Sequence, residues 1–311
     1  MTRRREVALI VTLAVLLASV LALAPGFFSA THLRGLALDR LPILVAALGM
    51  TIVIVSGQID VAVGAELAVL SALLGTLAKL GFAMPACVAL TLLAGLGLGA
   101  MHAVLVTALR APALLVTLAS LGILREGLRL AFGGAWILDL PRGFPWLGFS
   151  PELGGILYLV VALGLALGVA GFLRFTRNGR AVHAVGGGPD TAALLGVPVG
   201  ATRALALTIL GGLVAVAAVL HATRYPTIET EVGLGFELEV IACVVVGGAL
   251  PSGGRGSVLG TCLGWALFAL LGSTLVYLRV DAAWEKAVAG ALLVLGVAAD
   301  TAFAARNERH A

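Results

Sequence analysis

Ten long apolar stretches, separated by short polar segments, fill most of this 311-residue chain and limit what it can fold into. Hydrophobic residues make up 60% of the chain and charged residues only 12%, so a water-soluble domain could not bury this much apolar surface. A helix needs roughly 20 mostly apolar residues to cross a membrane. The ten candidate spans are Val7–Ala24, Leu41–Val55, Val61–Leu80, Pro85–Leu109, Pro112–Phe132, Leu153–Leu173, Arg203–His221, Leu238–Leu250, Ser257–Leu278 and Trp284–Phe303. The sequence therefore predicts an all-α polytopic transmembrane bundle, a single domain over residues 1–311, in which Leu238–Leu250 is a short or broken helix.

Charges at the ends of the spans predict the topology. Arg3–Arg5 precede the first stretch, and basic residues favour the cytoplasmic side of a membrane. Ten crossings return the C-terminus, with Arg306 and Arg309, to that side, so we expect both termini in the cytoplasm. The same parity places the segment 174–202 inside and the acidic segment Glu229–Glu239 outside. Without the short eighth segment as a span, the C-terminus would lie outside.

Glycines at four-residue spacing predict close helix packing. Gly95 and Gly99, Gly164 and Gly168, and the series Gly256, Gly260 and Gly264 each place small residues on one helix face. We expect these faces to pack inside the chain. The alternative is packing against a second copy.

The longest polar gap, residues 174–202, is too long for a plain connector and carries the signals of a short helix. The signals predict a helix over Ala192–Leu195 that lies parallel to the membrane. They are a tight turn at Gly186–Gly188 and Pro189, an N-cap at Asp190 or Thr191, a helix stop at Gly196, and Pro198.

A second glycine-rich segment, Gly247–Gly256, interrupts an apolar region with the letters GGALPSGGRG. The phosphate-binding pattern G-x-x-x-x-G-K-[ST] is absent, so we interpret the segment as a break in a membrane helix. Irregular backbone at that depth must be buried in protein or line a cavity. The glycines of this broken-helix loop are Gly247, Gly248, Gly253, Gly254 and Gly256.

Few residues in the chain could carry chemistry. Asp60 lies between apolar residues and needs a partner or water, while Glu126 and Arg129 have the spacing of an ion pair on one helix face. The histidines lack metal-ligand spacing, and we expect His102 and His221 to be hydrogen-bonded at span ends. Three cysteines, Cys87, Cys243 and Cys262, have the pattern of buried apolar residues. The sequence thus predicts no catalytic residue, no metal site and no nucleic-acid binding.

Five segments, in order over residues 47–300, together resemble the permease subunits of ribose-type sugar importers, which are bacterial ABC transporters. They are ALGMTIVIVSGQIDVAVG (47–64), PALLVTLASLGILREGL (112–128), GRAVHAVGGGPDTAALLGV (179–197), GFELEVIACVVVGGALPSGGRGSVLGT (235–261) and AWEKAVAGALLVLGVAAD (283–300).

The resemblance implies a multi-pass protein of the bacterial inner membrane that imports a monosaccharide or a related small polar molecule. It also implies three partners, namely a cytoplasmic ABC ATPase, a periplasmic sugar-binding protein and a second permease chain, identical or related. ATP and Mg²⁺ would bind to the ATPase, and this chain would need no cofactor. The segment that docks on the ATPase would be the coupling helix. Its residues here are Gly186, Gly187, Pro189, Asp190, Ala192, Ala193, Leu194, Leu195 and Gly196.

This chain departs from the family pattern at several positions, which leaves the solute open among ribose, rhamnose, xylose and a furanose-like signal of the autoinducer-2 type. Gln58 stands where a glycine is usual, and Ala62 stands where a serine or threonine is usual. Gly188 replaces a polar residue in the coupling segment. The loop glycines enclose Ala249, Leu250 and Pro251 in place of a serine-rich sequence.

A solute path must offer hydrogen bonds without trapping the solute. The candidates are Ser56, Gln58, Asp60, Glu66, Ser71, Thr117 and Ser120. A secondary transporter is the main alternative, and it would show two inverted halves with matching interrupted helices. A membrane-embedded enzyme would need an acid–base or metal cluster at one membrane face, and a structural scaffold would not need ionisable residues in its spans.

Overall fold

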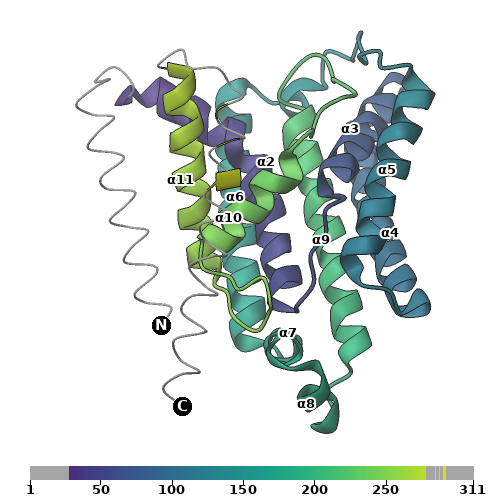
Figure 1. The fold of residues 1–311 in the computed structure, drawn as a ribbon. Coiled ribbons are helices and arrows are strands. Elements are labelled where there is room, and N and C mark those ends of the chain that lie inside the picture. The colour runs from purple at the N-terminus through teal and green to yellow at the C-terminus, as the bar shows by residue number, and fades with distance from the viewer. Residues whose placement is uncertain (1–27, 278–283, 285–286, 288–289, 292–311) are drawn as a thin grey trace.

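The computed structural model describes residues 28–277, 284, 287 and 290–291, and this part of the chain is helical apart from its connections (Figure 1). The predicted first span lies outside the described residues, as do both termini and all but four residues of the predicted last span, Trp284–Phe303. The helices are α2 (Ala30–Val55), α3 (Val63–Lys79), α4 (Met84–Leu109), α5 (Ala113–Phe132), the 3₁₀ turn η2 (Pro145–Gly148), α6 (Pro151–Phe175), α7 (Arg177–Gly187), α8 (Pro189–Leu194), α9 (Val199–Ala222), α10 (Phe236–Val246) and α11 (Val258–Tyr277).

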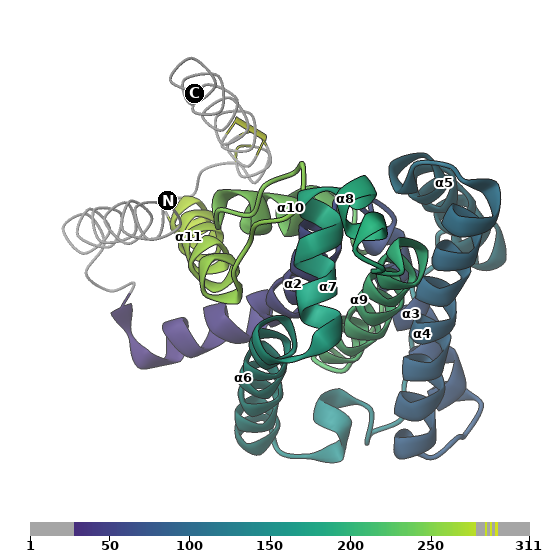
Figure 2. The ribbon, with the colours of Figure 1, turned by 90° about the horizontal axis from the view of Figure 1, so that it is seen from below.

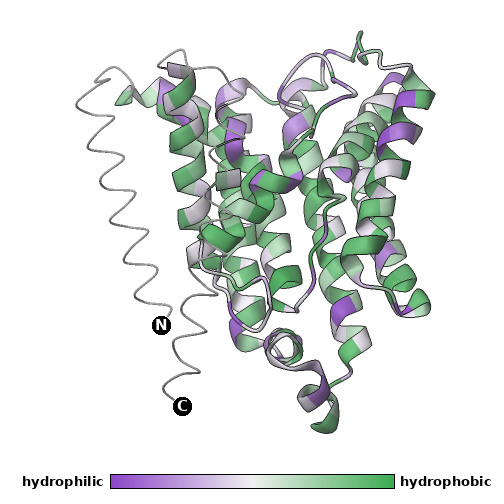
Figure 3. Ribbon diagram, viewed as in Figure 1, coloured by the Kyte–Doolittle hydropathy of each residue, from purple (hydrophilic) through white to green (hydrophobic). Residues whose placement is uncertain are grey.

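Five of the described helices are long and apolar enough to cross a membrane: α2, α4, α6, α9 and α11. Figure 3 shows hydrophobic colour along most of the length of these helices, with much of the hydrophilic colour toward the two ends of the bundle. The predicted all-α membrane bundle is therefore confirmed. Two other predicted spans are shorter, since α3 has 17 residues and α10 has 11.

Helix α2 forms the centre of the molecule. Every residue from Leu41 to Val55 is buried, because apolar residues surround the helix on all sides and α6, α9, α10 and α11 pack against it. The helix begins at Ala30, well before the predicted start at Leu41. The Ser29 hydroxyl caps it by accepting from the His32 N–H, and polar partners hold the extra turns.

Those partners bind Arg34 and Arg40, which lie before the predicted span Leu41–Val55. The Arg40 guanidinium pairs with the Glu239 carboxylate at 2.6 Å, and the Arg34 guanidinium donates to the Glu152 carbonyl at 2.7 Å. Charged side chains can therefore continue α2 beyond its apolar stretch because α6 and α10 supply acceptors.

The glycine spacing predicted on α4 packs inside the chain, as expected. A Cβ on Gly95 would lie 2.5 Å from the Ala215 Cβ, and one on Gly99 would lie 3.0 Å from the Thr208 Cα, both on α9. Gly211 of α9 faces the same two glycines, so the two backbones touch.

The other predicted glycine faces differ from each other. Gly260 and Gly264 of α11 pack against Gly247 and Cys243 of the α10 region, as expected. Gly164 and Gly168 of α6, by contrast, have open space where a Cβ would stand, so their face packs on nothing in the described part of this chain.

Two irregular segments interrupt the bundle. An extended connector, residues 57–62, follows α2 and leads to α3, and a loop, residues 247–257, joins α10 to α11 (Figure 1). The predicted helix break at Gly247–Gly256 is therefore present. The start of α3, just after the first break, meets the segment that leads into α10, because Gly64 of α3 faces the Gly233 backbone.

Helices α7 and α8 lie at one end of the bundle, which we call the α7–α8 end. Seen from there, they lie in front of α2 and α9 (Figure 2). The loops 133–150 and 223–235 lie at the opposite end (Figure 1), where Ile137 and Ile228 form an antiparallel bridge.

Candidate functional site

The α7–α8 end presents a short helix with exposed leucines at its tip. The Leu194 and Leu195 side chains are 89% and 77% exposed, whereas Ala192 on the same helix is buried. A soluble surface rarely exposes two adjacent leucines without a partner. The apolar tip of α8 therefore has the character of a docking surface.

The local structure of this segment differs from the prediction in two ways. Helix α8 begins at Pro189, which suits a first helical position, so Asp190 lies in the first turn and does not cap the helix. The glycines Gly186 and Gly187 do not form a turn, because they complete the last turn of α7, an 11-residue helix that the sequence did not reveal. Gly196 has φ +78°, as expected for a helix stop.

A junction of glycines connects α7 to the bundle. The Gly254 N–H of the broken-helix loop donates to the Val55 carbonyl at the end of α2 with an N···O distance of 2.8 Å. A Cβ on Gly186 would overlap that carbonyl oxygen and lie 2.5 Å from the Gly254 nitrogen, and His183 of α7 contacts the Gly254 carbonyl at 3.2 Å.

The junction makes α7, the end of α2 and the loop 247–257 one contiguous unit. A force on α8 reaches this unit through Gly188, which alone separates α8 from α7. Movement of the exposed tip can therefore be transmitted to α2, the most buried helix of the bundle.

The predicted solute-path residues are all buried, and the connector 57–62 brings several of them together. The Thr117 hydroxyl of α5 accepts from the Val61 N–H at 3.2 Å. Ser56, in contrast, donates to its own helix at the Val53 carbonyl. Ser71 lies further along α3 than Glu66, and Ser120 lies one turn beyond Thr117 on α5.

Gln58 borders a cavity of about 340 Å³ that lies near the α7–α8 end. Its other walls come from α4, α5, the start of α9 and Pro251 of the broken-helix loop. Two of its lining residues carry buried polar atoms, the Gln58 Oε1 and the Arg203 Nε, that have no hydrogen-bond partner among the described residues.

Asp60 and Glu66 lie beside His102 of α4, a residue that the sequence analysis assigned differently. The His102 Nδ1 lies 3.3 Å from the Asp60 Oδ2 and 3.2 Å from the Glu66 Oε1. The expectation that His102 lies at a span end is wrong, because the residue lies inside α4, is fully buried and faces two carboxylates. A histidine inside an apolar stretch needs a polar partner as much as Asp60 does. This need was the sequence signal that could have indicated that His102 and Asp60 lie together.

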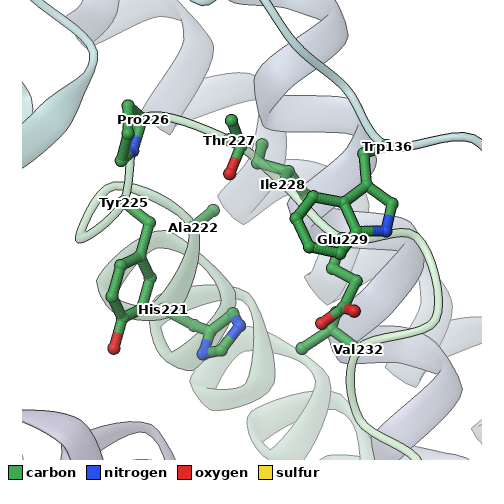
Figure 4. Close-up of a pocket in the computed structure, with 9 residues that line it drawn as sticks. All are labelled: Trp136, His221, Ala222, Tyr225, Pro226, Thr227, Ile228, Glu229 and Val232. Atoms are coloured by element: carbon green, nitrogen blue, oxygen red, sulfur yellow. The ribbon is translucent and has the colours of Figure 1, made fainter.

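A second cavity, of about 290 Å³, lies at the opposite end of the bundle beside the end of α9 (Figure 4). Figure 4 shows the Trp136 and Tyr225 rings with the Glu229 carboxylate and the His221 imidazole around it. The Tyr225 hydroxyl donates to the Asp39 carboxylate at 3.0 Å, and burial raises the pKa of that hydroxyl, so it remains a neutral donor at physiological pH. Aromatic faces beside polar groups suit a small polyhydroxylated molecule.

The predicted pair on α5 is also present. Arg129 and Glu126 approach to 3.5 Å, but both side chains are more than half exposed. The interaction is therefore a surface ion pair of small energetic value.

Comparison with known proteins identifies the family to which this helical chain belongs. Residues 32–297 match the family described as "Branched-chain amino acid transport system / permease component". The chain is 36% identical to the autoinducer 2 import system permease protein LsrC of Salmonella typhimurium (strain LT2) over 255 residues, which cover 82% of this chain and 73% of that protein.

Two further relatives cover more of the chain. LsrC of Escherichia coli O157:H7 is 35% identical over 288 residues, which are 91% of this chain and 83% of that protein. LsrC of Enterobacter sp. (strain 638) is 33% identical over 295 residues, 95% of this chain and 86% of that protein. No solved structure matches the chain. With a helical membrane bundle and matches of this extent, the chain belongs to the family of branched-chain amino acid transport system permease components, as a ribose-type ABC importer permease.

Proposed function

We propose that this chain carries a small polyhydroxylated solute, of the autoinducer-2 or monosaccharide class, across the bacterial inner membrane as part of an ATP-driven importer. Curated relatives that are 35–36% identical to the chain over the aligned residues are named for autoinducer 2 import, which supports this class of solute. The aromatic and polar walls of the cavity beside Trp136 suit such a solute.

The observation that carries the proposal is the exposed leucine tip of α8 joined to the buried core through the glycine junction. A permease without an ATP site needs a surface on which an ATPase can push. The Leu194 and Leu195 side chains supply apolar anchors for a groove in that ATPase. Closure of the ATPase would move α8, and the junction at Gly186 and Gly254 would pass the movement to α2 and the loop 247–257.

The same proposal orients the chain. Arg174, Arg177, Arg180 and Arg203 lie at or near the α7–α8 end, which the positive-inside rule assigns to the cytoplasm. The acidic segment Glu229–Glu239 then faces the periplasm, where a solute-binding protein would dock. Both termini would be cytoplasmic, and a second permease chain would complete the assembly.

The experiment compares Leu194→Glu/Leu195→Glu with the matched variant Leu234→Glu, an exposed leucine at the opposite end. Each permease is expressed with its ATPase, and we measure both ATPase co-purification and uptake of labelled autoinducer 2, ribose, rhamnose and xylose. We expect the double variant to lose ATPase binding and all uptake, because docking would bury two carboxylates in an apolar interface. Leu234→Glu should retain the ATPase.

Normal ATPase association in the double variant would contradict the docking role of α8. If the wild-type complex is intact but takes up none of the four solutes, the proposed solute class is contradicted instead. Uptake that needs an ion gradient and not ATP would overturn the importer mechanism.

A further inference from the structure

Three ionisable side chains from distant parts of the sequence converge in the interior of the bundle. Asp60 comes from the extended connector, Glu66 from the first turn of α3, and His102 from the middle of α4. The exposed fractions of Asp60, Glu66 and His102 are 1%, 1% and 0%. Three such groups in one apolar interior carry a high desolvation cost unless something neutralises them.

His102 by itself cannot supply that neutralisation, because a protonated imidazole paired with both carboxylates would offset only one of their two negative charges. The His102 Nδ1 lies within 3.3 Å of both carboxylates, yet neither contact has the alignment of an N–H···O hydrogen bond. Within the described residues, both Glu66 oxygens and both His102 nitrogens are buried without a hydrogen bond of good geometry. Only Asp60 is held independently, because its Oδ1 accepts from the Ala62 N–H at 2.8 Å. Its other oxygen, Oδ2, faces His102.

The spacing of these atoms fits a shared metal ion. One nitrogen of His102 and one oxygen each from Asp60 and Glu66 all lie within 4.8 Å of one another. In a tetrahedral site with bonds of about 2.0–2.2 Å, neighbouring ligand atoms are about 3.3–3.6 Å apart. The two distances from Nδ1, 3.2 and 3.3 Å, lie at the short end of that range.

The charges fit as well. Two carboxylates and a neutral imidazole carry a charge of −2, which a divalent ion cancels. Imidazole with carboxylate ligands suits zinc, manganese, iron, cobalt or nickel in the divalent state. The Ala62 N–H orients one of the carboxylates, as the supporting hydrogen bonds of metal ligands do.

We propose that Asp60, Glu66 and His102 bind one divalent transition-metal ion that fastens the connector 57–62 and the start of α3 to α4. Side chains hold the last two backbone N–H groups of the connector, since Val61 donates to Thr117 and Ala62 donates to Asp60. An ion shared with α4 would fix the connector further. The sequence alone predicts no metal site, because the three residues have no ligand spacing along the chain and only the fold brings them together.

The test uses the full-length chain without an affinity tag, purified in lipid nanodiscs and loaded with Zn²⁺ or Mn²⁺. We measure bound metal per chain by mass spectrometry of the elements after extensive dialysis, and the thermal midpoint with and without metal. The site variants are Asp60→Asn and His102→Asn. Glu126→Gln is the matched control, because Glu126 is an exposed acid outside the cluster.

We expect one tightly held ion per chain in the wild type and in Glu126→Gln, with a higher thermal midpoint, and loss of both in the site variants. X-ray absorption at the zinc edge should show nitrogen and oxygen ligands at about 2.0–2.2 Å without sulfur. A wild-type chain that retains no metal overturns the proposal, whether or not the variants fold. Metal content equal in the wild type and in folded His102→Asn also overturns it. These readouts need no transport, so they are independent of the proposed importer function.

Discussion

Single backbone positions decide whether the α7–α8 end is connected to the bundle. Gly186 and Gly187 are adjacent in α7, yet only Gly186 faces the Val55 carbonyl and the Gly254 nitrogen, while Gly187 has open space where a Cβ would stand. Neither residue has a positive φ, so the difference lies in packing alone. Matched substitutions at Gly186 and Gly187 therefore test whether movement passes from α8 through this junction to α2.

We expect Gly186→Ala to separate α7 from the loop 247–257, because its Cβ would overlap backbone atoms that cannot move alone. Overpacking of this kind costs about 1–3 kcal/mol, so the thermal midpoint should fall and ATP-driven uptake should drop sharply. Gly187→Ala should be neutral or slightly stabilising, since alanine is the better helix former by about 0.5–1 kcal/mol. Equal uptake in the two variants, measured at equal membrane expression, would show that the junction does not transmit movement.

The contact between helices α4 and α9, which we call the α4–α9 seam, shows how small residues allow helices to associate in lipid, where the hydrophobic effect does not drive association. Lipid chains solvate apolar side chains as well as another helix does, so association depends on close backbone contact. Gly95 and Gly99 of α4 allow that contact with Gly211 of α9, and the same two helices position His102 and Arg203. The seam therefore supports the interior polar groups as well as the fold.

For this seam we expect Gly99→Ala to lower the thermal midpoint of the purified chain and Gly97→Ala to leave it unchanged. The two glycines lie on the same helix, but a Cβ on Gly99 meets the α9 backbone and a Cβ on Gly97 meets nothing. The predicted cost at Gly99 is about 1–3 kcal/mol, from forced separation of the helices. Identical midpoints, determined by thermal unfolding in the same detergent, would contradict the seam.

The sequence could predict the elements of this seam but not all of their partners. Four-residue glycine spacing indicates a packing face on α4, α6 and α11 alike. In the structure, the glycine faces of α4 and α11 pack against other helices, while Gly164 and Gly168 of α6 face open space in the described chain. The reason is physical, because spacing fixes which residues share a face but not which way that face is turned.

At the scale of the whole molecule, the two ends of the bundle differ in chemistry. The α7–α8 end carries arginines and the exposed leucines of α8, while the opposite end carries the acidic segment Glu229–Glu239 and an aromatic cavity. This asymmetry is what an importer requires, since solute arrives on one side and ATP is consumed on the other.

The proposed orientation predicts which probes can reach each end. In intact cells, Leu195→Cys should resist a membrane-impermeant thiol reagent, whereas Leu234→Cys should react with it. In inside-out vesicles the pattern should reverse. Both variants are made in a Cys262→Ser background, since Cys262 is only partly buried whereas Cys87 and Cys243 are buried. Labelling of Leu195→Cys from outside intact cells would invert the topology.

The sequence by itself determined that this chain is a helical membrane protein, where its helices break, and which family it resembles, because hydropathy and turn signals are properties of short local windows. Only the tertiary structure decided the partners of groups far apart in the chain. In the tertiary structure, His102 contacts both Asp60 and Glu66, and Gly186 packs against the Val55 carbonyl. Gly186 and Gly187 form the last turn of helix α7. Such contacts depend on the depth and rotation of each helix, which packing sets after the helices have formed.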